Sequence, residues 1–169
     1  GVARDRDVDD YEALLTNETR QSVVEADLCM QISYDDRLVM MPAVFEMEVT
    51  HRSLPQMAEH AGLLFKNWAD MGVFEGFCAY PRREVRGDAT RGPFAAFYFQ
   101  VVRNWDDDPT TFRVEKFMSI GTAEHRTQRT TFEAVVKQWR KFNVTTVRGV
   151  PLDVFEKNPQ KAVTELTRN

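Results

Sequence analysis

The sequence predicts an α+β protein with an open, mainly antiparallel sheet of four to five strands and helices packed on one face. Segments in which every second residue is apolar, typical of strands, alternate along the chain with segments whose apolar residues recur at helical spacing. Two of the helical segments open with a capping signature. The 12 Phe against only 8 Gly and 7 Pro also favour long regular elements over a loop-rich fold. N-terminal helices and a C-terminal helix are expected to flank this sheet.

The chain of 169 residues is expected to form one domain. Residues 1–8 are mostly polar and charged, which predicts a flexible N-terminal arm. Residues 9–169 show no internal repeat, no low-complexity tract and no shift in composition that would mark a linker. We therefore expect a single α+β domain over residues 9–169.

Two helices are expected ahead of the sheet. Asp9 or Asp10 can cap a short first helix, because a side-chain oxygen there accepts from the free backbone N–H groups of the first turn. Asn17 can cap a second helix, whose apolar residues recur at every fourth position. These residues are Val24, Leu28 and Ile32. The pair Asp35-Asp36 then predicts a turn.

Beyond Pro42 the sequence alternates strictly, which is the pattern of a half-buried strand. The apolar side consists of Ala43, Phe45, Met47 and Val49. The polar side consists of Glu46, Glu48, Thr50 and Arg52. We expect the apolar side to face the core.

The next helix has the clearest boundary signals in the chain. Ser53 and Gln56 form a capping box, in which each side chain bonds the backbone N–H of the other residue. Pro55 lies in the first turn, where its missing N–H is not needed. Gly72 follows the last turn, as a left-handed C-terminal cap would require. Apolar residues at helical spacing define the buried face: Leu54, Met57, Ala61, Leu64, Phe65 and Trp68.

Two further strands are expected to form an antiparallel hairpin. The segment 94–104 is almost continuously apolar, as expected for a central strand covered on both faces. The segment 111–120 alternates between apolar and polar residues. Asp106 to Asp108, between them, predict a turn rather than a calcium site, because a calcium loop spaces its ligands at alternate positions. The segment 73–80 alternates poorly and is left out of the predicted element order.

Three elements complete the predicted chain. Thr130 and Glu133 form a second capping box that opens a helix with a buried apolar stripe. The run 144–148 is short and rich in β-branched residues, typical of a strand. Asn158, followed by Pro159, caps a last helix. The order in the middle of the chain is then β-α-β-β-α-β, so the ferredoxin-like fold is the topology that we predict.

Charge and cysteine content give only weak indications about the class of protein. The net charge of −4 argues against a dedicated nucleic-acid binder, which usually carries a basic excess. Cys29 and Cys78 are too few for a disulfide framework, and two buried reduced thiols are expected. This favours a reducing intracellular compartment, either the cytoplasm or an organelle entered with a targeting peptide that preceded Gly1. The longest apolar stretch, 94–102, is too short to span a membrane.

The sequence contains no motif for nucleophilic catalysis, phosphate binding or metal ligation. We therefore predict no catalytic residue, no metal and no cofactor, and we favour a protein that is not an enzyme. One alternative is a small enzyme or ligand-binding domain with a pocket near His51 and His60. These two histidines lie on the alternating strand and on the helix that follows it, so they could approach each other.

An arginine-rich loop is the most suggestive polar feature. It spans residues 81–93, and a second basic group lies on or just before the helix that Thr130 opens. Guanidinium groups pair well with carboxylate and phosphate, so these residues are candidates for binding an acidic partner. The candidate binding residues are Arg82, Arg83, Arg86, Arg91, Arg126, Arg129 and Arg140.

The hypothesis that we favour is a non-catalytic protein-interaction module or an accessory subunit of a larger assembly. Its contact surface would be the arginine-rich loop, and its partner another protein or a second copy of this chain. A further alternative is an RNA-binding protein that uses the basic groups at 82–91 and 126–141, although the acidic net charge argues against it.

Overall fold

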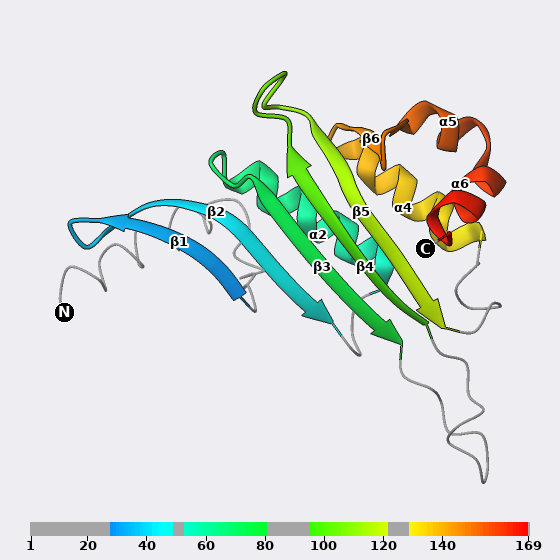
Figure 1. The fold of residues 1–169 in the computed structure, drawn as a ribbon, viewed down its shortest axis with the longest axis horizontal. Coiled ribbons are helices and arrows are strands. Elements are labelled where there is room, and N and C mark those ends of the chain that lie inside the picture. Colours follow the sequence, from blue (N-terminus) through cyan, green and yellow to red (C-terminus); the bar gives the residue numbers. More distant parts are fainter. Residues whose placement is uncertain (1–27, 49–52, 81–94, 122–128, 169) are drawn as a thin grey trace, which may run out of the picture.

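The computed structural model describes residues 28–48, 53–80, 95–121 and 129–168, and its centre is a seven-stranded mixed sheet (Figure 1). The strands lie side by side in chain order. They are β1 (Leu28–Tyr34), β2 (Arg37–Glu48), β3 (Val73–Tyr80), β4 (Ala95–Arg103), β5 (Phe112–Gly121), β6 (Val144–Val147) and β7 (Val150–Pro151). The described helices are α2 (Leu54–Asn67), α4 (Arg129–Lys141), α5 (Leu152–Lys157) and α6 (Pro159–Leu166).

The predicted fold class is correct at the level of α+β and wrong in its detail. The sheet has seven strands rather than four to five, and it is a mixed sheet without the ferredoxin-like strand order, although most neighbouring strands are antiparallel as predicted. The neighbours β2 and β3 run parallel with α2 between them in the chain, and β5 and β6 run parallel with α4 between them. All other neighbouring strands run antiparallel. Each crossover helix therefore joins adjacent strands, which the ferredoxin-like arrangement does not allow.

The end of the second predicted helix, with Leu28 and Ile32, is instead the strand β1. The start of that helix at Asn17, the first predicted helix and the predicted N-terminal arm lie outside the described residues. A spacing of four residues fits a helix, but it is also a multiple of the two-residue period of a strand, so it does not discriminate between them. The turn predicted at Asp35 and Asp36 is confirmed. Both residues have positive φ, 50° and 60°, which suits the tight turn of a hairpin between β1 and β2.

The strand β3 was left out of the predicted order because it carries apolar residues on both faces. Phe74, Gly76 and Cys78 face the helices, while the residues between them face the other way. A Cβ on Gly76 would lie 3.0 Å from Met57 of α2 and 3.0 Å from two phenyl rings. The glycine therefore lets α2 pack closely on the middle of the sheet.

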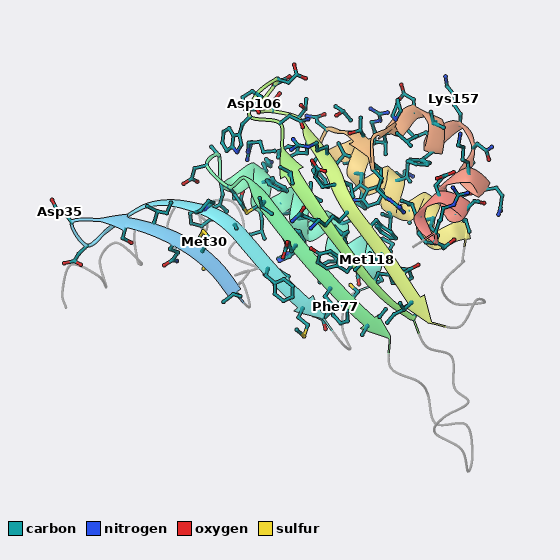
Figure 2. All side chains as sticks on the ribbon, viewed as in Figure 1. Met30, Asp35, Phe77, Asp106, Met118 and Lys157 are labelled. Carbon is teal, nitrogen blue, oxygen red and sulfur yellow. The ribbon has the colours of Figure 1, made fainter. Side chains whose placement is uncertain are left out.

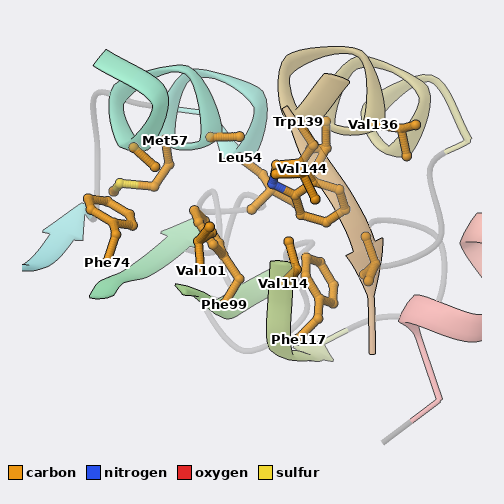
Figure 3. Packing of buried hydrophobic residues seen from close by; sticks show 14 of the residues in the cluster. Leu54, Met57, Phe74, Phe99, Val101, Val114, Phe117, Val136, Trp139 and Val144 are labelled. Atoms are coloured by element: carbon orange, nitrogen blue, oxygen red, sulfur yellow. The ribbon is translucent and has the colours of Figure 1, made fainter. Parts of the chain in front are cut away.

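The core lies between the sheet and the two crossover helices, which contact each other on the same face (Figure 3). The capping box of α2 is confirmed, since Ser53 and Gln56 exchange side-chain to backbone hydrogen bonds. Trp139 of α4 is fully buried against Phe99 and Phe117. The predicted apolar residues are buried on both helices, which confirms the amphipathic patterns: Leu54, Met57, Ala61, Leu64, Phe65 and Trp68 for α2, and Phe132, Val135, Val136 and Trp139 for α4.

Three further predictions about single elements are resolved in the structure. The turn at Asp106 to Asp108 is confirmed, and the Asp108 carboxylate accepts from the Thr110 amide and hydroxyl. These bonds hold the pKa of Asp108 below its usual value. The cap at Asn158 is also confirmed, because its side chain accepts from the Lys161 amide at the start of α6. In the described part of the chain, no helix is long and apolar enough to cross a membrane.

The sheet has one face covered by helices and one face free of them in the described residues (Figure 1). This corrects two predictions. The strand β4 is not covered by helices on both faces. On β2, the side that faces the helices is that of Val44 and Glu46, and both are buried. Met47, on the predicted core side, is 51% exposed. The predicted apolar side of β2, where the structure describes it, thus belongs to the helix-free face: Ala43, Phe45 and Met47.

Candidate interaction surface

The helix-free face of the sheet carries an apolar row that crosses four strands. Met47 of β2 pairs with Phe77 of β3, Phe77 pairs with Tyr98 of β4, and Tyr98 pairs with Met118 of β5. Residues paired across neighbouring strands share a face, so these four side chains form one continuous row. Figure 2 shows Phe77 and Met118 on the side of the sheet turned away from α2 and α4.

Large apolar side chains are unusually exposed on this part of the molecule. Six of the eight exposed large apolar residues in the described chain belong to β1, β2 and β5. Their exposed fractions run from 46% for Ile32 to 66% for Leu28. The six are Leu28, Met30, Ile32, Met47, Met118 and Ile120. Single exposed apolar residues are ordinary, but a group of them on adjoining strands marks an interaction site.

A polar group interrupts the apolar face near its centre. The Glu75 carboxylate accepts hydrogen bonds from the Tyr98 hydroxyl at 3.0 Å and from the Gln100 amide at 2.8 Å. Partial burial, together with the hydrogen bond to Glu75 and its negative charge, raises the pKa of Tyr98 to about 12. Tyr98 therefore remains a neutral hydrogen-bond donor at any physiological pH, and the three residues give the face a fixed polar feature.

The strand β1 forms one edge of the described sheet, and it lacks the features that usually protect an edge. Its sequence, Leu-Cys-Met-Gln-Ile-Ser-Tyr, contains no charged residue and no proline. The opposite edge, β7, is only two residues long and ends in a proline. Short edges, charges and prolines are the means by which proteins prevent pairing with another chain. Within the described residues, the β7 edge is therefore protected, and no strand pairs with the outer side of β1.

The apolar side chains of β1 join this edge to the helix-free face. Leu28 pairs with Phe45, and Met30 pairs with Ala43, both on the helix-free side of β2. The β1–β2 hairpin also extends beyond the layer formed by α2 and α4 (Figure 1). We call the exposed apolar residues of β1 together with the row from Met47 to Met118 the docking surface.

The predicted arginine sites are only partly described by the structure. Arg82, Arg83, Arg86, Arg91 and Arg126 lie outside the described residues. Arg129 begins α4, and the structure does not describe its side chain.

Arg140 is described, and it contacts acidic residues of its own chain. Its guanidinium bonds Glu156 and Asp153 of α5, which raises its pKa above the usual value. All three side chains are largely exposed, so these pairs contribute only about 0.2–1 kcal/mol each. Arg140 thus helps to hold α5 against α4.

The two histidines proposed for an alternative pocket are not brought together in the described structure. His51 lies outside the described residues. His60 is buried under β2, where a hydrogen bond of 3.2 Å joins its Nε2 to Glu46 Oε1. Phe74 packs edge-on against the same ring, with the ring centroids 6.1 Å apart. His60 is therefore part of a buried polar pair, and it lines neither the cavity between α2 and α4 nor the smaller one between α4 and α5.

Neither cysteine suggests a metal or nucleophile site in the described residues. Cys78 is buried in the core, as predicted, whereas Cys29, also predicted to be buried, is half-buried and packs against that core. No group of three or more His, Cys, Asp or Glu side chains that could hold a metal ion occurs within the described ranges.

Arg103 is a notable residue that the sequence patterns did not indicate. It ends β4 and is buried, and its guanidinium donates to the carbonyl oxygens of Phe65, Trp68, Met71 and Pro109 at 2.7–3.1 Å. Two of these carbonyls lie in the last turn and cap of α2, where helix carbonyls lack partners. Gly72, expected to cap this helix, does not adopt positive φ, and Trp68 is the C-cap residue. Arg103 supplies the missing hydrogen bonds.

No protein-family model matches the chain, and no curated protein or solved structure matches it. What the protein does is therefore inferred from its own residues.

Proposed function

We propose that this protein is a non-catalytic interaction module, or an accessory subunit of a larger assembly, whose docking surface receives an extended segment of a partner protein. The observation that carries the proposal is the edge strand β1. It has seven residues, no charge and no proline, and its apolar side chains at 28, 30 and 32 are exposed.

A strand added at this edge would pair with the backbone of β1 and cover its apolar side chains. Its backbone would pair with the N–H and C=O groups on the outer side of β1, which is how peptides add to exposed sheet edges. Its side chains would cover the apolar residues of β1, and burial contributes about 25 cal/mol per Å² of apolar surface. Leu28, Met30 and Ile32 alternate with Gln31 and Ser33, so the partner segment should carry apolar residues at alternate positions.

The charges near the docking surface do not oppose such a partner. Glu75 accepts hydrogen bonds from Tyr98 and Gln100, and Arg113 bonds the adjacent Glu115. The Arg113–Glu115 pair has no net charge, and Lys116 lies in the same cross-strand row as Glu75 through Gln100. The described face therefore has no dominant sign of charge, so apolar contact and backbone pairing would determine affinity, with electrostatics setting mainly the rate of encounter.

The test compares two double variants of β1 that add the same charge on opposite faces. Leu28→Glu with Met30→Glu places carboxylates on the helix-free face, whereas Gln31→Glu with Ser33→Glu places them at positions that are already polar and exposed. Each variant and the wild type would be tagged and captured from the source cells, and the co-purified proteins quantified by mass spectrometry.

We expect the same partner to be recovered with the wild type and with the Gln31→Glu, Ser33→Glu variant, and to be lost with the Leu28→Glu, Met30→Glu variant. Sedimentation velocity on the purified proteins would show whether that partner is a second copy of this chain. A partner that binds all three proteins equally, or a monomer with no partner that depends on β1, would refute the proposal.

Neither alternative function gains support at the residues that the sequence predicted for it. His60 is buried in its pair with Glu46, and of the basic groups only the part on α4 is described, where Arg140 contacts acidic residues of α5.

A further inference from the structure

A groove of about 540 Å³ lies on the opposite side of the sheet from the docking surface. It lies between α2 and the C-terminal end of α4, over the adjoining ends of β4 and β5. Its volume falls within the range of about 300–1,000 Å³ that is typical of small-molecule sites. None of its lining residues belongs to β1, β2 or β3, so it is separate from the docking surface.

Three phenyl rings form the apolar part of this groove. The ring centroids of Phe65 and Phe112 are 4.4 Å apart, and Phe142 lies 5.7 Å from Phe112 and 6.3 Å from Phe65. Phe65 and Phe112 are buried in the core, while Phe142 is half-buried. A Cβ on Gly62 would lie 2.6 Å from Phe142, so the glycine lets this ring lie close against α2.

The charged residues that line the groove are mainly cationic. Lys66, Lys141 and Arg103 line it, against the single carboxylate of Glu59. Lys66 and Lys141 are exposed, and within the described ranges no ion pair joins either of them to an acidic residue.

Arg103 adds a buried donor to this set. Its four hydrogen bonds to backbone carbonyls leave one of its five N–H groups without an acceptor among the described residues. A buried N–H group is stabilised by any acceptor that reaches it, so the groove favours a ligand that carries oxygen.

We propose that this groove binds an amphipathic organic anion, namely a carboxylate carried on an aliphatic or aromatic body. The carboxylate would pair with Lys66 and Lys141, because charge-assisted hydrogen bonds are stronger than neutral ones. The apolar body would lie against the rings of Phe65, Phe112 and Phe142. This inference does not depend on the proposed function.

The test uses octanoate as the probe and octanamide as its uncharged counterpart, with binding followed by the shifts of backbone amide resonances in ¹H–¹⁵N spectra. We expect octanoate to shift the resonances of Leu63, Lys66, Phe142 and Asn143, and octanamide to bind more weakly. Lys66→Glu combined with Lys141→Glu should raise the dissociation constant of octanoate by about tenfold or more, because favourable charge is replaced by repulsion.

Two further variants separate binding from effects on folding. Lys157→Glu is the charge control for Lys66→Glu alone, because both lysines lie in the last turn of a helix and Lys157 does not line the groove. It should leave octanoate affinity unchanged. Ala69→Trp would fill the groove from an exposed position, so it should abolish binding while the protein remains folded.

Three results would overturn the inference. They are the absence of saturable shifts with octanoate, an equal loss of affinity in Lys157→Glu, and shifts that concentrate at Met47, Phe77 and Met118 instead of the groove. The last result would show that octanoate binds the apolar docking surface.

Discussion

Arg103 shows how one buried side chain can hold several elements together. Its guanidinium bonds carbonyls at the end of α2, in the segment before β3 and in the turn between β4 and β5. It also lies over the rings of Phe65, Trp105 and Phe112, with distances of 4.8–5.5 Å to their centroids. Burial lowers its pKa, while the nearby charge of Asp70 opposes that shift. The planar fork of an arginine is needed to reach all four carbonyls.

Arg103→Lys should therefore destabilise the protein although it keeps the charge. An ammonium group cannot satisfy four carbonyls at these positions, and each buried carbonyl left unpaired costs roughly 1–3 kcal/mol. We expect a loss of about 3 kcal/mol in the free energy of unfolding, measured by urea denaturation. The matched control is Arg113→Lys on the neighbouring strand, whose guanidinium is partly exposed and should cost less than about 1 kcal/mol. Equal effects of the two substitutions would contradict the capping role.

Tyr98 allows a direct test of the polar feature on the docking surface. Its pKa is raised to about 12, so folding favours the neutral phenol. The stability it contributes is fully present below pH 10.0 and is lost as the pH rises through about 12. Glu75→Gln removes the negative charge and should lower the pKa of Tyr98 toward 10. The pKa of Tyr98 is measured by absorbance titration at the tyrosinate band. The curve of Tyr98→Phe is subtracted to remove the signal of the other tyrosines. A titration curve unchanged by Glu75→Gln would show that Glu75 has no influence.

At the scale of elements, α2 positions the core because both of its ends are satisfied. The capping box closes its N-terminus, and Arg103 bonds the carbonyls at its C-terminus. Between these ends, its apolar face packs on β3 and on α4. A helix of 14 residues gains little stability alone, so this packing and these caps determine whether it forms.

Ser53→Ala should cost about 1 kcal/mol of stability, because it leaves an amide of the first turn of α2 without its side-chain acceptor. Thr164→Ala is the control, since its hydroxyl bonds only a carbonyl of its own helix, α6, on an exposed surface. Thermal or urea unfolding of both variants gives the comparison. A loss in Ser53→Ala no larger than that in Thr164→Ala would show that the box adds nothing.

Local signals predicted an element correctly where a helical pattern of apolar residues began at a capping residue. Ser53 with Gln56 predicted α2, and Asn158 predicted the start of α6. The signals failed where a pattern fits two structures. Leu28 and Ile32 fit both a helix and a strand, and β3 shows no alternation because both of its faces carry apolar residues. Because β1 and β3 are missing from the predicted strand order, the predicted topology differs from the observed one. Errors in the ends of helices and strands have a smaller effect.

The same ambiguity hid the docking surface from sequence reasoning. Alternation on β2 identifies two faces but not which of them the helices cover, and the partner of Glu46 is a histidine 14 residues later. Which face is buried depends on contacts between distant segments, so residues such as Met47 can be judged exposed only once the sheet is assembled. The predicted arginine sites are mostly outside the described residues, and they stay predictions.

At the scale of the whole molecule, the two faces of the sheet differ in what they bury. The covered face packs the aromatic core against α2 and α4 (Figure 3), while the helix-free face and the β1 edge leave apolar side chains in contact with solvent. Exposed apolar residues add little to the stability of a monomer. Their concentration on one face is explained if a partner covers them in the assembled state.

Site-specific photo-crosslinking tests this central claim most directly. A photoreactive amino acid would replace Met30 on β1 or Met118 on β5. The control position is Lys157 on α5, which lies apart from both (Figure 2). The docking account predicts covalent adducts to the same partner protein from positions 30 and 118, and none from position 157. Adducts that form only from position 157, or equally from all three positions, would contradict it.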